Sequence, residues 1–178
     1  ELAHQKHGKL PWATKFQPAI TLASNGFKVS PRLHTLLGAE KELQKDPTAA
    51  AYFYQADGKP HAVGHVLKNP ELAAVLQKIA QQGAKALHEG EVAQAIVDKV
   101  NRHPSNPGRM SLADLAGYTP KQREALCHDL AGAGRDFRVC GFPPPSSGAI
   151  AVGQILGIMA RTSAARLPLQ DGLPSADW

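Results

Sequence analysis

The chain has 178 residues, 43% of them hydrophobic, 20% charged and 6% aromatic, a composition typical of a globular protein that excludes a disordered one. This length is enough to bury a core as one domain, and the scarcity of aromatic residues favours helices over an aromatic-rich β-sandwich. The formal net charge is +5, but the basic residues are scattered along the chain, so we expect no nucleic-acid partner.

The first part of the chain is predicted to form two helices. Apolar residues recur at helical spacing through Leu10–Asn25, and Gly26 is placed to end that helix in a left-handed conformation. Ser30 is a typical N-cap residue and is followed by Pro31, which is favoured at the first helical position. This pair predicts a second helix that runs towards Leu37.

The middle of the chain is predicted to combine short extended pieces with further helices. Tyr52–Tyr54 is interpreted as extended, because aromatic residues favour strands. Asn69 is the expected N-cap of a helix that ends at Gly83, and Ser111 with Asp114 resembles a capping box for a shorter helix. The inward faces expected for the helix after Asn69 and for the next one are Leu72, Val75, Leu76 and Ile79, then Val92, Ile96 and Val100.

Two cysteines flank a glycine-containing reversal in the last third of the chain. Gly132 and Gly134 permit a tight turn, so the segments on either side could pair as a hairpin. Such a hairpin could bring the thiols of Cys127 and Cys140 together. A disulfide fits an oxidising compartment, whereas two free, buried thiols explain the pattern equally well. Neither cysteine belongs to a zinc-binding motif.

The run Pro143–Gly148, Pro-Pro-Pro-Ser-Ser-Gly, follows the second of these extended segments. Its three prolines make the chain stiff and extended, and the hydroxyls of Ser146 and Ser147 come where a helix is predicted to begin. The serines could cap that helix or act in catalysis. We favour capping, because a proline precedes Ser146 and the run lacks the G-x-S-x-G pattern of a nucleophile.

The apolar stretch Ala149–Ala160 is predicted to be a buried helix. Its Gly153 and Gly157 are four residues apart, which indicates close packing inside a protein. The stretch is too short to cross a bilayer, so no membrane span is predicted.

The histidines provide no convincing metal site. His61 and His65 are four residues apart, but the segment that holds them lacks helical periodicity, so a structural or surface role is favoured. The residues by themselves therefore predict no catalytic group, no metal and no organic cofactor.

Several of these motifs occur in an order that resembles the γ-glutamyltranspeptidases, also called γ-glutamyltransferases. The final run resembles that family's PPPSSGG signature, with Ala149 in place of the last glycine. The blocks that carry the resemblance are Pro11–Ile20 with Gly26–Ser30, Asn69–Ala73 with Ile79 and Gly83, Leu112–Ala116 with Tyr118, and Pro143–Gly148.

The resemblance implies both a fold and a mechanism. The fold is α+β, mostly helical with short strands, and residues 1–178 are a single segment of the large subunit, an incomplete domain of a four-layer αββα N-terminal-nucleophile hydrolase sandwich. In this family a precursor cleaves itself and exposes a threonine, whose hydroxyl attacks a γ-glutamyl amide. Neither that threonine nor the family's substrate-binding arginine matches a position in this chain. We therefore assign no catalytic residue and expect the segment alone to be inactive.

The resemblance also implies partners and a location. These are the small subunit of the same precursor and a γ-glutamyl substrate, glutathione or a related amide, in the periplasm or outside the cell. Ser146, Ser147 and Gly148 are expected near the substrate, and core-facing surface is expected to be exposed. The alternative is a non-catalytic helical scaffold or interaction protein derived from the family, which the alanine at position 149 favours.

Overall fold

The computed structural model describes residues 1–132, 135–163 and 167–174 and divides the chain into two compact units, Glu1–Thr119 and Pro120–Trp178. About half of the chain is helical and the strands are short, so the expected α+β class is confirmed. No helix among the described residues is long and apolar enough to cross a membrane.

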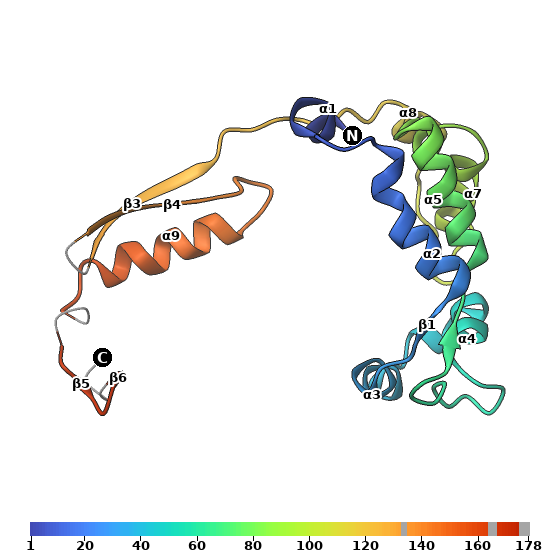
Figure 1. Ribbon diagram of the computed structural model, residues 1–178, viewed down its shortest axis with the longest axis horizontal. Helices are drawn as coiled ribbons and strands as arrows, with labels where there is room; N and C mark the ends of the chain where they lie inside the picture. The colour runs from blue at the N-terminus through green and yellow to red at the C-terminus, as the bar shows by residue number, and fades with distance from the viewer. Residues whose placement is uncertain (133–134, 164–166, 175–178) are drawn as a thin grey trace. The chain divides into compact units, whose positions relative to one another are not determined.

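The first unit consists of helices and one short antiparallel ladder (Figure 1). The ladder pairs β1 (Phe27–Lys28) with β2 (Val66–Leu67). The helical elements are α1 (Leu2–His7), the 3₁₀ turn η1 (Ala13–Phe16), α2 (Gln17–Asn25), α3 (Pro31–Ala39), the 3₁₀ turn η2 (Leu43–Lys45), α4 (Pro47–Phe53), α5 (Pro70–Gln82), α6 (Lys85–His88), α7 (Gly90–Asn101) and α8 (Leu112–Ala116).

The core of the first unit lies between α2 and α5, which lie side by side (Figure 1). Ile20 and Ala23 of α2 are buried against Ala73 of α5, and Phe16 and Leu76 pack against this cluster. Because two of the three buried residues are alanines, the helices can approach closely, and the core is made by backbone proximity as much as by large side chains.

Three predicted helix starts are confirmed by their capping hydrogen bonds. The Ser30 hydroxyl accepts from the Leu33 amide at 3.1 Å, and the Asn69 side chain accepts from the Leu72 amide at 2.8 Å. Ser111 and Asp114 form the expected capping box at the start of α8. Each side-chain cap satisfies an amide that the helix itself leaves unpaired.

The expectation that Tyr52–Tyr54 is extended is wrong for its first two residues, which belong to α4. Asp46 caps this helix, since its carboxylate accepts from the amides of Thr48 and Ala49 at 2.9 and 3.0 Å. Proline at the first helical position and the alanines that follow favour the helix more than the aromatic pair favours a strand. Only Tyr54 is extended, and its hydroxyl donates to the Leu37 carbonyl at 3.0 Å.

The inward faces of α5 and α7 agree with the expectation only in part. Val75, Leu76 and Ile79 are half-buried, and Leu76 packs against the core. Leu72 is 47% exposed, whereas its neighbour Ala73 is 4% exposed and lies in the core. In α7 the buried residues are Ala93 and Val97, whereas the predicted Val92, Ile96 and Val100 are half-buried. Hydrophobic periodicity located both helices, but the closest contacts are made by smaller residues one position further along the chain.

The second unit is a hairpin covered by one helix. β3 (Leu126–Gly132) pairs antiparallel with β4 (Arg135–Gly141), which confirms the predicted hairpin, although Gly134 of its tip lies outside the described residues. The helix α9 (Gly148–Met159) packs against both strands (Figure 1). A short ladder of β5 (Leu169–Gln170) and β6 (Leu173–Pro174) follows.

The prediction that the apolar stretch forms a buried helix is wrong for most of α9. Only Ala149 and Gly153 are buried, while Ile155 and Ile158 are 57% and 63% exposed. The hairpin covers one side of the helix. The remaining apolar side chains therefore form an exposed face.

Candidate functional site

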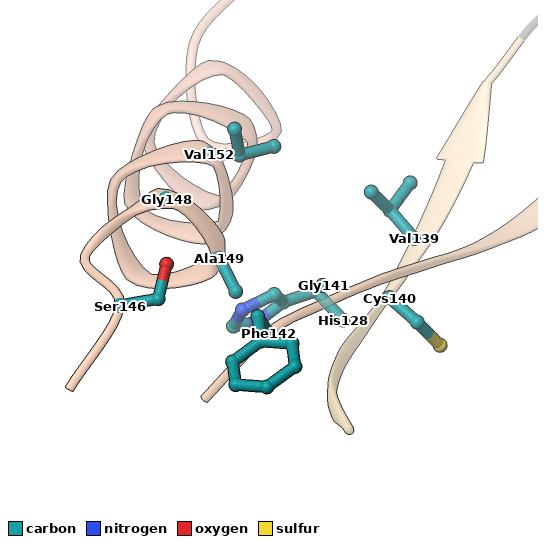
Figure 2. A pocket seen from close by; sticks show the side chains of 9 residues that line it. All are labelled: His128, Val139, Cys140, Gly141, Phe142, Ser146, Gly148, Ala149 and Val152. Atoms are coloured by element: carbon teal, nitrogen blue, oxygen red, sulfur yellow. The ribbon is translucent and has the colours of Figure 1, made fainter. Parts of the chain in front are cut away.

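A pocket of about 320 Å³ lies in the second unit, between the hairpin and the start of α9 (Figure 2). Its lining includes Ser146 and Gly148 from the proline-rich run, and His128 from β3. Ser147, the third residue expected near a substrate, does not line it. The structure thus brings two of the three expected residues to one cavity, together with a histidine that the sequence did not single out.

The proline-rich run forms a turn that carries the chain from β4 into α9. The Ser146 amide donates to the Pro143 carbonyl at 3.1 Å, and the peptide bond between Pro144 and Pro145 is cis. Both Ser146 and Ser147 are exposed. The turn therefore presents two hydroxyls to solvent directly before the first turn of a helix.

The prediction that these serines cap the helix is wrong for Ser147, which occupies the N-cap position without a side-chain capping bond. Its backbone is helical, with φ −85° and ψ −17°, whereas a capping side chain needs an extended N-cap residue. The Ser147 carbonyl still accepts from the Ala151 amide at 2.9 Å. The hydroxyl and the first amides of α9 therefore do not satisfy one another, and both can meet a ligand.

The side chain of His128 packs directly between the hairpin and α9. Its Nε2 atom is buried and has no hydrogen-bond partner among the described residues. Gly153 lies directly over the ring, and a Cβ atom at that position would overlap it. A second glycine, Gly141, faces Ala149, where an added Cβ would come within 2.9 Å of the alanine methyl group. Both contacts depend on the missing side chain of a glycine.

The sequence contained part of this signal. The spacing of Gly153 and Gly157 predicted close packing, and this is confirmed for Gly153 only, because a Cβ at Gly157 would meet nothing nearer than the end of the Arg161 side chain at 3.8 Å. His128 could be recognised as a site residue only once the hairpin was known. Side chains alternate along a strand, so His128 points to the face opposite to that of its neighbour Cys127.

Cys127 and Cys140 are directly opposite each other in the hairpin and form a disulfide in the structure, with 4.1 Å between their Cα atoms. Cys140 is exposed and Cys127 is half-buried. Figure 2 shows the sulfur of Cys140 pointing away from α9. The bridge therefore joins the strands on the face that α9 does not cover.

The histidines of the first unit do not form a metal centre in the structure. The rings of His61 and His65 stack with their centroids 3.9 Å apart and their planes 7° from parallel. Parallel rings cannot direct their nitrogen lone pairs at one ion, since those lone pairs lie in the ring planes. Burial, followed by the charge of His65, lowers the pKa of His61. Among the described residues no group of three His, Cys, Asp or Glu side chains could hold a metal.

Comparisons with known proteins match most of the length of this chain. The family model described as Gamma-glutamyltranspeptidase matches residues 1–173. The chain is 34% identical over 159 residues to Glutathione hydrolase 2 of Arabidopsis thaliana, and 36% identical over 155 residues to the Acylase ACY 1 proenzyme of Pseudomonas sp. (strain SE83). These alignments cover 89% and 86% of this chain and 26% of each relative.

The fold agrees with the same family. The crystal structure of Helicobacter pylori gamma-glutamyltranspeptidase superposes with a TM-score of 0.81 at 28% identity, over 94% of this chain and 46% of that chain. The chain belongs to the γ-glutamyltranspeptidase family. It spans about a quarter of the length of the curated relatives named above.

Proposed function

We propose that the protein to which this chain belongs is a γ-glutamyltransferase that hydrolyses or transfers γ-glutamyl groups from glutathione or related amides. The observation that carries the proposal is the turn Pro143–Gly148, which resembles the family signature and lines the pocket with Ser146 and Gly148. The name of the plant relative, a glutathione hydrolase, supports this substrate class. The acylase relative supports the broader class of amides.

The proposed chemistry divides the work between this segment and the rest of the precursor. A threonine exposed by self-cleavage supplies the hydroxyl that attacks the γ-glutamyl carbonyl, and its own α-amine takes the proton. Water or an amino acid then accepts the acyl group. The exposed hydroxyls of Ser146 and Ser147 and the first amides of α9 supply hydrogen bonds to the substrate.

The larger assembly belongs to the same proposal. We infer that residues 1–178 lie in the large subunit and that the fold is completed as a four-layer αββα sandwich with the small subunit of the precursor. The word proenzyme in the name of the acylase relative supports a processed precursor. A periplasmic or extracellular location is supported by the disulfide, because such bridges persist in oxidising compartments.

The test uses the whole protein and a chromogenic γ-glutamyl anilide. We expect release of the γ-glutamyl group, and we expect the Ser146→Ala and Ser147→Ala variants to lose turnover while their unfolding free energies change little. Ser105→Ala, in an exposed loop of the first unit, is the matched control and should keep full turnover. Correctly folded whole protein without any γ-glutamyl release would overturn the proposal.

The second candidate is a non-catalytic scaffold derived from the family, and Ala149 is the residue that favours it. In the structure, however, the Ala149 methyl group occupies the space left by Gly141. The departure from the signature therefore has a packing explanation that does not require loss of activity. If the Ala149→Gly variant gains γ-glutamyl release that the natural protein lacks, the scaffold is the correct function.

A further inference from the structure

The disulfide lies on the open face of the hairpin. Side chains alternate along a strand, and His128 and Gly141 face α9. Their strand neighbours Cys127 and Cys140 therefore face the other side, where Cys140 is exposed. Within the second unit, a small molecule in solution can reach the Cys140 sulfur without displacing the helix.

The surroundings of the bridge carry balanced charge. Arg138 and Asp129 are the next opposed pair on the same face, and the Arg138 Nε atom lies 3.8 Å from the Asp129 carboxylate. Both side chains are mostly exposed, so the pair is weak and the guanidinium can also meet an incoming anion. Arg138 is two residues from Cys140 on the same face of the strand, and a cation there favours both the approaching thiolate and the thiolate that leaves the bridge.

We propose that Cys127–Cys140 is a thiol–disulfide exchange site for low-molecular-weight anionic thiols of the glutathione class. The thiolate attacks the Cys140 sulfur, a new sulfur–sulfur bond forms there, and the bond to Cys127 breaks with its electron pair leaving on the Cys127 thiolate. A second thiolate attacks the bound thiol's sulfur and releases Cys140 as a thiolate. Two small thiols are thereby oxidised to one small disulfide, and the protein bridge is reduced to two thiols.

Reduction of the bridge by exchange removes a covalent constraint next to the turn that lines the pocket. β4 ends at Gly141, one residue after Cys140, and the turn begins at Pro143. The backbone ladder remains after reduction, but the covalent tie at the turn-proximal end of the hairpin is lost. We expect a lower rate of γ-glutamyl release from the reduced protein. This consequence rests on the proposed function, whereas the exchange itself does not.

The first experiment measures exchange by intact mass. Whole, oxidised protein is incubated with glutathione, quenched with acid and weighed, with the Cys127→Ser and Cys140→Ser variants treated with oxidised glutathione. We expect reduction of the natural bridge, and an adduct that forms several-fold faster on Cys140 than on the half-buried Cys127. A bridge that reacts only after unfolding in denaturant, or equal rates at the two cysteines, would overturn the proposal.

A variant that removes the charge of Arg138 tests whether the site prefers anionic thiols. Arg138→Gln should slow reduction by glutathione about threefold more than reduction by 2-mercaptoethanol, because the glutathione thiolate carries one more net negative charge, and one charge at roughly 6 Å in water contributes that factor. Equal slowing with both thiols would contradict the preference for an anion. The Lys121→Gln variant, on the same unit but outside the hairpin, controls for net charge.

The second experiment separates exchange from turnover. γ-Glutamyl release from the thiol-free anilide is measured before and after reduction, for the natural protein and for the variant with serine at both positions 127 and 140. We expect reduction to slow only the natural protein. If exchange occurs by mass while turnover is unaffected, the coupling to the turn is wrong. If no variant releases product but exchange still occurs, the proposed function fails and the exchange site stands.

Discussion

The helices α5 and α9 are of nearly equal length, 13 and 12 residues, yet they are held in opposite ways. α5 has a side-chain cap from Asn69 and one buried face that meets α2. α9 has no side-chain cap, is apolar apart from Gln154, and rests on the hairpin through Ala149 and Gly153. A capped, amphipathic helix is specified locally, whereas an uncapped, apolar one depends on what packs against it.

The difference extends to the function of the two units. In the first unit α3, α4, α5 and α8 have side-chain caps, from Ser30, Asp46, Asn69 and Ser111, whereas α1, α2, α6 and α7 have none. The second unit leaves the serine hydroxyls and the first amides of α9 unsatisfied beside a pocket. Unsatisfied polar groups at a cavity are what a binding site needs, and a protein gives up local stability to keep them.

The largest expected effect is the loss of stability when the disulfide of the hairpin is removed. Replacing both Cys127 and Cys140 by serine should lower the unfolding free energy of the whole protein by about 3 kcal/mol, because the bridge closes a loop of some 15 residues in the unfolded chain. Denaturant unfolding measures the loss. The intact mass of the natural protein should also rise by about two daltons on reduction, and an unchanged mass would rule out the bridge.

A pair of glycine variants tests how α9 packs against His128. Gly153→Ala places a methyl group where the buried His128 ring lies, and should cost about 1–3 kcal/mol of unfolding free energy through overpacking. Gly157→Ala, one turn further along the same helix, has open space and should be neutral or stabilising by about 0.5–1 kcal/mol. Equal effects at the two positions would show that His128 does not seat the helix.

The caps provide a smaller contrast between the helices. Asn69→Ala removes the bond to the Leu72 amide and should cost about 1 kcal/mol of unfolding free energy. Ser147→Ala removes no capping bond, so its cost should be close to zero while turnover falls. A Ser147→Ala variant as destabilised as Asn69→Ala would restore the capping role that the sequence had suggested.

The smallest effect is a pH dependence confined to the first unit. The Ser111 hydroxyl, followed by the Ser111 amide, lowers the pKa of Asp114 in the capping box. A carboxyl whose pKa is lower when folded than when unfolded stabilises the protein above its unfolded pKa, and this is lost as the pH falls through the folded value. Asp114→Asn should therefore flatten the acid limb of the unfolding curve. Unchanged acid sensitivity would indicate that the box does not form.

Local patterns predicted some parts of the structure well, and tertiary packing decided others. Ser30, Asn69 and Ser111 were sufficient to place three helix starts, because capping needs only residues three positions apart. Tyr52 and Phe53 misled, since a strand preference depends on a partner strand that is not there, whereas Asp46 and Pro47 act within one turn. Only part of the candidate site could be predicted from the sequence. The serines belong to the recognised motif, whereas His128 does not.

The sequence by itself determined the helix starts at Ser30, Asn69 and Ser111, the hairpin, and the turn Pro143–Gly148 with its family resemblance, because each depends on neighbours along the chain. Only the tertiary structure decided that Ala73 rather than Leu72 faces the core, and that Ser147 is free instead of capping. It alone placed His128 beneath Gly153. These outcomes depend on how closely two elements approach, and that distance is set by packing between residues far apart in sequence.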